Sequence, residues 1–156
     1  ALDAQGGLGG VRGGRVLPLA AFLVDYYVPA REPDEMVVEI RVPAPAADHA
    51  GIYTRHLRTA AEHRPLVNVA LAARVSGQAG RDYRLVVGAS VTVPARQARA
   101  EAFLEGRVVT PGGAAALGAA TIDPPPAQRG SPDSRREMVK VVARRAIARL
   151  FCLPEA

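Results

Sequence analysis

Alternating apolar and polar positions predict β-strands in the first 93 residues of the chain. In residues 35–43, Met36, Val38, Ile40 and Val42 face one way and the residues between them face the other. The same period of two recurs in residues 66–75 and 82–93. A short turn containing two glycines joins these two segments, so we expect an antiparallel hairpin. Residues 51–57 are a further predicted strand, and residues 15–25 predict a short strand that runs into a helical turn.

The hydrophobic period changes after Pro94. Residues 96–104 fit a helix that ends near Gly106, and Thr110 with Pro111 opens an alanine-rich segment predicted to be helical to about Ile122. Residues 128–150 predict the longest helix. Ser131 can cap it, Pro132 and Asp133 suit its first turn, and the apolar stripe is Met138, Val139, Val142, Ala146 and Leu150.

Strands followed by helices predict an α+β fold. We expect an antiparallel sheet of three or four strands with three helices packed on one face. The core of this sandwich should bury side chains of the two central strands against the last helix. They are Val69, Leu71, Leu85 and Val87 from the strands, with Val142 and Ala146 from the helix.

A cluster of six glycines in residues 6–14 raises the question of a phosphate-binding loop. Such a loop follows a strand and opens a helix, and the pattern here shows neither. We therefore interpret the segment as a flexible hairpin turn.

The net charge is +5, and Lys140 is the only lysine among 20 basic residues. A GC-rich coding sequence explains this arginine bias, and so would an acidic-partner or nucleic-acid surface. Aromatic residues do not interleave the arginines, so we do not expect a nucleic-acid partner. The seven basic side chains between Arg129 and Leu150 are interpreted as a solvated helix face or a contact with an acidic partner subunit.

The remaining composition argues against a membrane span, a metal site and a catalytic site. No run of about 18 apolar residues is present, which predicts no membrane span, and the single cysteine, Cys152, fits a cytoplasmic location. His49, His56 and His63 lack partners at zinc-like spacing, so we predict no metal site. Catalytic residues are likewise predicted to be absent, because no nucleophile–base pair or paired carboxylates can be assembled.

Several segments occur in the order of one known family. The chain resembles the C-terminal part of the FAD-binding subunit of molybdenum hydroxylases, the carbon monoxide dehydrogenase and xanthine dehydrogenase group. The segments that carry the resemblance are ALDA (1–4), RVLPLAAF (15–22), PDEMVVEIRVP (33–43), YTRHLR (53–58), RPLVNVA (64–70), VVGASVTVPARQARAEAFLEG (86–106) and RGSPDSRR (129–136).

The resemblance implies two domains and a role in electron transfer. Residues 1–43 would be the end of the FAD-binding domain with a crossover strand, and residues 44–156 the flavoprotein C-terminal domain. Electrons would pass from a molybdopterin-binding large subunit through an iron–sulfur small subunit to FAD. The family's glycine-rich FAD segments lie before ALDA, so the chain is expected to be a fragment that does not bind FAD by itself.

The resemblance also implies flavin-site residues. Val38 would pack on the isoalloxazine, with ordinary core packing as the alternative. Arg55 stands where the family often has lysine, near the flavin ring, and Arg58 follows it; exposed strand charges are the alternative. Ser134 replaces a tyrosine of the family. A different class of function also stays open, a free-standing interaction or scaffold domain that has lost the flavin.

Overall fold

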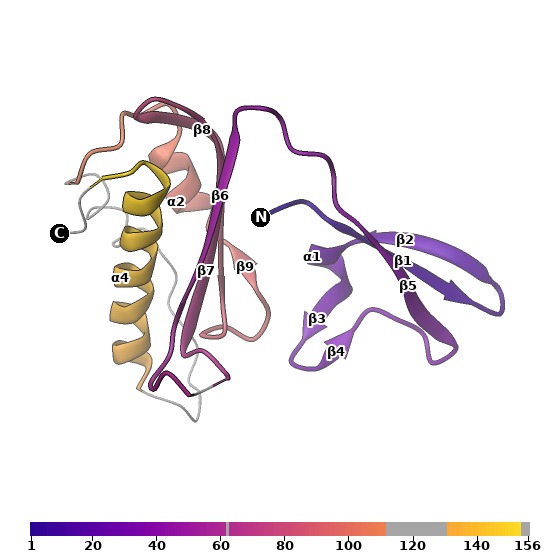
Figure 1. Ribbon diagram of the computed structural model, residues 1–156. Helices are drawn as coiled ribbons and strands as arrows, with labels where there is room; N and C mark the ends of the chain where they lie inside the picture. Colours follow the sequence, from indigo (N-terminus) through magenta and orange to yellow (C-terminus); the bar gives the residue numbers. More distant parts are fainter. Residues whose placement is uncertain (62, 112–130, 154–156) are drawn as a thin grey trace. The chain divides into compact units, whose positions relative to one another are not determined.

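The computed structural model describes residues 1–61, 63–111 and 131–153. The chain divides into two compact units, Leu2–Pro45 and Ala46–Ala156, which are drawn in Figure 1 and described one at a time. None of the described helices is both long enough and apolar enough to cross a membrane.

The smaller unit is built on a three-stranded antiparallel sheet in the order β2-β1-β5. Its strands are β1 (Gln5–Gly10), β2 (Gly13–Pro18) and β5 (Glu35–Arg41). Between β2 and β5 the chain forms the short helix α1 (Leu19–Phe22) and a small hairpin of β3 (Leu23–Asp25) and β4 (Val28–Pro29). The predicted strand in residues 35–43 and the predicted strand and helical turn in residues 15–25 are confirmed.

The glycine-rich segment forms a hairpin, but the prediction that it is a flexible turn is wrong. All six of its glycines lie inside β1 and β2, and only Val11 and Arg12 form the turn. The glycines let strand β5 approach closely. A Cβ added at Gly7 would lie 2.7 Å from Cγ of Glu39, and one at Gly9 would lie 2.9 Å from Cγ1 of Val38.

The larger unit contains a four-stranded antiparallel sheet in the order β6-β7-β8-β9. The strands are β6 (His49–His56), β7 (Val67–Ser76), β8 (Ala79–Gly88) and β9 (Ala95–Arg96). A tight turn with Gly77 at φ +60° joins β7 to β8, as the predicted antiparallel hairpin requires. Both α2 (Ala98–Leu104) and α4 (Pro132–Leu150) contact the sheet from the same face (Figure 1).

Strand β8 is shorter than the alternation predicts. It ends at Gly88 rather than Val93, because Ala89 adopts φ +61° and turns the chain out of the extended conformation. The chain then returns as β9, which pairs with Val86 and Val87. Just beyond β9, Oε1 of Glu101 accepts a hydrogen bond from the Leu85 backbone N–H (2.8 Å), which ties α2 to β8.

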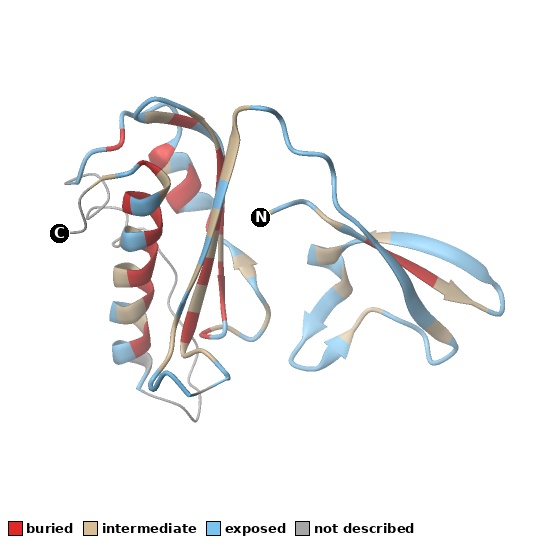
Figure 2. Ribbon diagram, in the orientation of Figure 1, coloured by how far each residue is buried: buried red, intermediate tan, exposed pale blue. Residues whose placement is uncertain are grey.

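Helix α4 begins as predicted. The Ser131 hydroxyl accepts a hydrogen bond from the Ser134 N–H at 3.1 Å, and Pro132 occupies the first turn. The predicted core is confirmed, because Val69, Leu71, Leu85, Val87, Val142 and Ala146 are at most 4% exposed and belong to one cluster. In Figure 2 the buried parts of helix α4 lie on its side toward the sheet, where the strands are also coloured as buried.

The buried stripe of α4 is wider than predicted. It includes Ala143 and Ile147, both fully buried, whereas Met138 and Leu150 are only partly buried. Arg135 was expected on a solvated face but is 3% exposed, and its Nη1 donates to the Ser90 carbonyl at 3.2 Å. The predicted helix in residues 110–122 lies almost wholly outside the described residues, so two of the three expected helices are seen on the sheet.

Replacing Val142 with aspartate should unfold the larger unit. The carboxylate would be buried without a partner, which costs several kcal/mol against a typical domain stability of about 5–15 kcal/mol. Val108→Asp is the matched control, because Val108 is 64% exposed. Thermal unfolding followed by circular dichroism measures both variants, and an unchanged Tm for Val142→Asp would contradict this packing.

Replacing Tyr83 with phenylalanine should stabilise the larger unit. The Tyr83 hydroxyl is buried beside Gly80 and Phe151 and has no hydrogen-bond partner among the described residues. Burial raises the pKa of Tyr83 to about 12, and an unsatisfied buried hydroxyl costs about 1–3 kcal/mol. Urea unfolding should therefore give a higher free energy of unfolding, with no change for the exposed control Tyr53→Phe; a loss of stability would show that the hydroxyl has a partner.

Candidate functional site

The four-stranded sheet has one face without a helix among the described residues, here called the outer face. Its inner face is fixed by Val67, Val69 and Leu71, which pack in the core with α4. Because side chains alternate along a strand, Asn68 and Ala70 of β7 belong to the outer face. On β6 the partly buried Ile52 packs against the core, so Tyr53 and Arg55 lie on the outer face.

Strand register arranges the outer-face residues in rows. Arg55 of β6 is paired with Asn68 of β7, and Asn68 is paired with Gly88 of β8. The neighbouring row is Tyr53, Ala70 and Val86. Ala70 and Gly88 carry little or no side chain, and the longest polar side chains in the two rows are those of Tyr53 and Arg55.

Several other arginines of this unit form ion pairs, and Arg55 forms none with a described residue. Its side chain is exposed and makes no hydrogen bond or ion pair with any other described residue. By contrast, Arg74 binds both carboxylate oxygens of Asp48 (2.8 and 3.0 Å) and Arg81 adds a third contact at 3.2 Å. These hydrogen bonds, with that of Arg74 the strongest cause, lower the pKa of Asp48 to about 2. Arg55 therefore keeps its charge available for a group outside the described chain.

Arg58, the second predicted cation, lies in the bend that follows β6 and is exposed. It is three residues beyond Arg55 and near the same end of the strand. The structure thus brings Arg55 and Arg58 to one end of β6, while Val38 belongs to the smaller unit.

Val38 lies in the middle of β5 and is 62% exposed. The other apolar residues of this strand, Met36, Val37 and Ile40, are also exposed. The described part of the smaller unit therefore does not provide the core packing that was the alternative for Val38, and Gly9 beneath it is the close neighbour.

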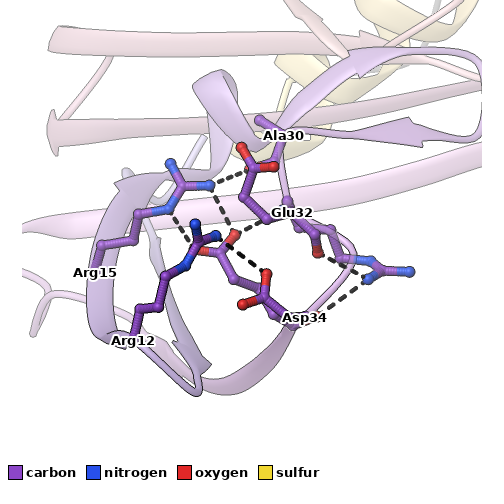
Figure 3. Close-up of polar contacts among 7 residues, drawn as sticks. Arg12, Arg15, Ala30, Glu32 and Asp34 are labelled. Carbon is purple, nitrogen blue, oxygen red and sulfur yellow. Dashed lines mark hydrogen bonds and ion pairs between the residues drawn. The ribbon is translucent and has the colours of Figure 1, made fainter.

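Polar contacts hold the start of β5 in place (Figure 3). The Glu35 cluster consists of Arg12, Arg15, Ala30, Arg31, Glu32, Asp34 and Glu35. Arg15 binds Glu35 through two hydrogen bonds of 2.7 and 2.8 Å and also donates to the Ala30 carbonyl at 3.0 Å. The Glu32 backbone N–H donates to Oε2 of Glu35 at 2.8 Å. The cluster joins β2, the loop before β5 and β5 itself, and so positions the strand that carries Val38.

The glycine-rich segment does not provide a phosphate cradle. Strand β1 lies between β2 and β5, and both neighbours are paired with it along its length. Its backbone N–H groups therefore point toward partner strands rather than into an open nest. Among the described residues, the glycines of β1 therefore do not form an anion-binding nest.

The histidines do not converge on a metal. His49 and His56 are both on β6, and their separation of seven residues places them on opposite faces of the sheet. Within the described residues no three His, Cys, Asp or Glu side chains are arranged to hold a metal ion. Cys152 is exposed just beyond α4.

A family model, the CO dehydrogenase flavoprotein C-terminal domain, matches residues 53–150. This match covers most of the larger unit and more than half of the chain. The chain belongs to the CO dehydrogenase flavoprotein C-terminal domain family.

Solved structures agree with this assignment. Carbon monoxide dehydrogenase from Hydrogenophaga pseudoflava is 28% identical with a TM-score of 0.87, covering 97% of this chain and 54% of that chain. Quinoline 2-oxidoreductase from Pseudomonas putida 86 shares the fold at 23% identity and a TM-score of 0.88, covering 97% and 53%. The carbon monoxide dehydrogenase of Oligotropha carboxidovorans has 24% identity and a TM-score of 0.85, covering 98% and 54%.

The chain spans about half the length of the solved structures it matches. A search of curated proteins found no match. The suspected relationship to the FAD-binding subunits of molybdenum hydroxylases is confirmed, and so is the α+β fold with antiparallel sheets.

Sequence reasoning missed two residues, one in each unit. Asn68 lies between Arg55 and Gly88 on the outer face. The available signal was a single carboxamide inside an otherwise apolar strand, VNVALA. Arg15 was treated as part of an apolar strand, although its ion pair with Glu35 orders the smaller unit.

Acid should release the Glu35 cluster only at very low pH. The hydrogen bonds from Arg15, the largest cause, and from the Glu32 N–H lower the pKa of Glu35 to about 2. A depressed carboxyl pKa stabilises the folded state above the ordinary value near 4.5, and this contribution disappears as pH falls toward 2. The Glu32 amide signal in NMR spectra should therefore titrate near pH 2.

The matched variant is Arg15→Gln, which removes the cation and keeps Glu35. In this variant the Glu32 amide should titrate closer to the ordinary pKa of a glutamate. A midpoint near 4.5 in the unmodified chain would show that the Arg15–Glu35 pair does not form in solution.

Proposed function

We propose that the chain is the C-terminal half of the FAD-binding subunit of a molybdenum hydroxylase-type oxidoreductase. In this role it helps to cover the flavin and to dock partner subunits, while electrons pass from molybdenum through iron–sulfur clusters to FAD. We assign no catalytic group to the described residues. The observation that supports the proposal most directly is the family match over residues 53–150, combined with an unpaired cation, Arg55, on the outer face of the matched domain.

Bound FAD would accept the electrons, and this chain's part would be to shape the environment of the ring. Arg55 would face the ring and stabilise negative charge that develops on it. The cation is effective there because no carboxylate among the described residues neutralises it. Arg58, exposed in the bend after β6, would add positive charge at the same end of the strand.

Val38 would supply the apolar contact to the isoalloxazine. Its strand is fixed by the Glu35 cluster, and the side chain is largely exposed in the described chain. A flat ring against Val38 would remove apolar surface from water, which stabilises the complex by about 25 cal/mol per Å² of buried surface.

This proposal divides the chain into residues 1–43, the end of the FAD-binding domain, and residues 44–156, the flavoprotein C-terminal domain.

The pyrophosphate of FAD would be held by protein outside this chain. The glycine N–H groups of β1 face the neighbouring strands, so they do not form an anion-binding nest. The share of the relatives that the chain does not cover, nearly half, is long enough to supply one. The partners proposed with it are a molybdopterin-binding large subunit and an iron–sulfur small subunit, in the cytoplasm.

Titrating this chain with FAD should give no saturable binding at micromolar concentration. The ring contacts alone must offset lost translational and rotational freedom, estimated at about 4–15 kcal/mol. Quenching of FAD fluorescence measures the binding, and the complete subunit, containing the N-terminal FAD region, is the positive control. Saturable micromolar binding by the chain alone would contradict this account.

The same control separates the proposal from the scaffold alternative. If the complete subunit purifies yellow, the chain serves a flavoprotein. If the complete subunit also fails to bind FAD, the domain has kept its fold and lost the flavin.

A further inference from the structure

Asn68 is the polar exception in the central strand of the larger unit. Its neighbours in sequence, Val67 and Val69, are fully buried in the core, and Asn68 lies on the opposite, outer face. The strand register places it directly beside Arg55 on one side and Gly88 on the other. A side chain at this position can therefore act together with Arg55.

Gly88 leaves room for the Asn68 side chain to lie across strand β8. A Cβ added at Gly88 would be 2.3 Å from Oδ1 of Asn68 and 3.3 Å from its Cγ. Only glycine at position 88 leaves this space open. The carboxamide is thus held along the outer face, on the side away from Arg55, rather than standing free of the sheet.

The Asn68 carboxamide has unused hydrogen-bonding capacity among the described residues. Asn68 is only partly exposed, and its side chain makes no hydrogen bond with another described residue. Asparagine offers one acceptor oxygen and two N–H donors, and Arg55 beside it offers donors alone. From Arg55 toward Gly88, the row therefore presents the Arg55 donors, the Asn68 N–H donors and last the acceptor Oδ1, the carboxamide atom nearest Gly88.

The pyrimidine edge of a flavin carries the complementary pattern. Along it N1 and the C2 carbonyl oxygen accept hydrogen bonds, and the adjacent N3–H donates. We propose that Asn68 reads this edge, accepting from N3–H through Oδ1 and donating to the C2 carbonyl through its N–H group, while Arg55 donates to N1. This inference rests on the proposed function and adds to it a residue that decides which ring is accepted.

The test compares FAD with N3-methyl-FAD in the complete subunit. Methylation removes the N3–H and leaves both carbonyls in place. A single net hydrogen bond corresponds to roughly a three- to tenfold change in affinity. The unmodified subunit should therefore bind FAD about three- to tenfold more tightly than the methylated form, and Asn68→Ala should bind the two equally.

Two further variants sharpen the comparison. Gly88→Ala keeps Asn68 but displaces the flexible end of its side chain, so it should lose the discrimination as well. Gln78→Ala is the matched control, because it removes an exposed carboxamide from the turn at the other end of the same β7–β8 hairpin. It should discriminate as the unmodified subunit does, and circular dichroism checks that each variant is folded.

The outcomes distinguish failure of the proposed role of Asn68 from failure of the proposed flavin placement. Discrimination that survives Asn68→Ala, or is absent from the unmodified subunit, overturns the role of Asn68 and leaves the proposed function standing. If Asn68→Ala and Arg55→Gln both leave FAD affinity unchanged, the flavin does not lie on the outer face and the proposed placement fails. The same result, accompanied by weaker assembly with partner subunits, would assign the outer face to a protein partner.

Discussion

Burial of helix α4 against the inner face of the sheet is the interaction on which the larger unit depends. Ala143, Ala146 and Ile147 are fully buried against valines and leucines of β7 and β8. Alanines at two of these positions let the helix approach the sheet closely. Since α2 and α4 both contact this face, all of the apolar packing is on one side, and the outer face can be polar without cost to the core.

The smaller unit is ordered by a different kind of interaction. Leu8 is its only large hydrophobic residue that is buried among those described, and Figure 2 shows how little of the unit is buried. Its strands are joined by backbone pairing and by the Glu35 cluster. Charged pairs at a solvated surface contribute less stability than an apolar core of the same extent. We therefore expect the larger unit, which has an apolar core, to be more stable by itself than the smaller unit.

The sequence was most informative where periodicity and local signals agreed. Alternation identified β5 and β7, and a serine followed by proline identified the start of α4, because these patterns act through neighbours in the chain. The end of β8 was missed because Ala89 adopts a positive φ. Alanine rarely has this conformation, so its presence in the sequence does not indicate a strand end. The glycine-rich strands were missed because glycine is needed there on account of β5, about 30 residues away in the chain. Side chains of β5 fill the space that a Cβ would need.

In the candidate site, too, features that depend on local sequence were predicted and features that depend on distant contacts were not. The resemblance located Arg55 and Arg58 on one strand end, and this needed no knowledge of packing. Asn68 could not be found in that way, since its significance comes from the register that puts it between Arg55 and Gly88. Buried Arg135 was missed for a similar reason, because its acceptor, the Ser90 carbonyl, is 45 residues distant in the chain.

Strand β5 has a consequence for how this protein behaves during synthesis. It lies at the edge of its sheet among the described residues, and valine, methionine and isoleucine side chains project from it into solvent. An unprotected edge with apolar side chains is a template for pairing with other chains, and natural proteins usually block such edges with charge or cover. Glu35, Glu39 and Arg41 on the same strand supply part of that charge, and covering the apolar side chains of β5 would further lower the tendency of the chain to self-associate.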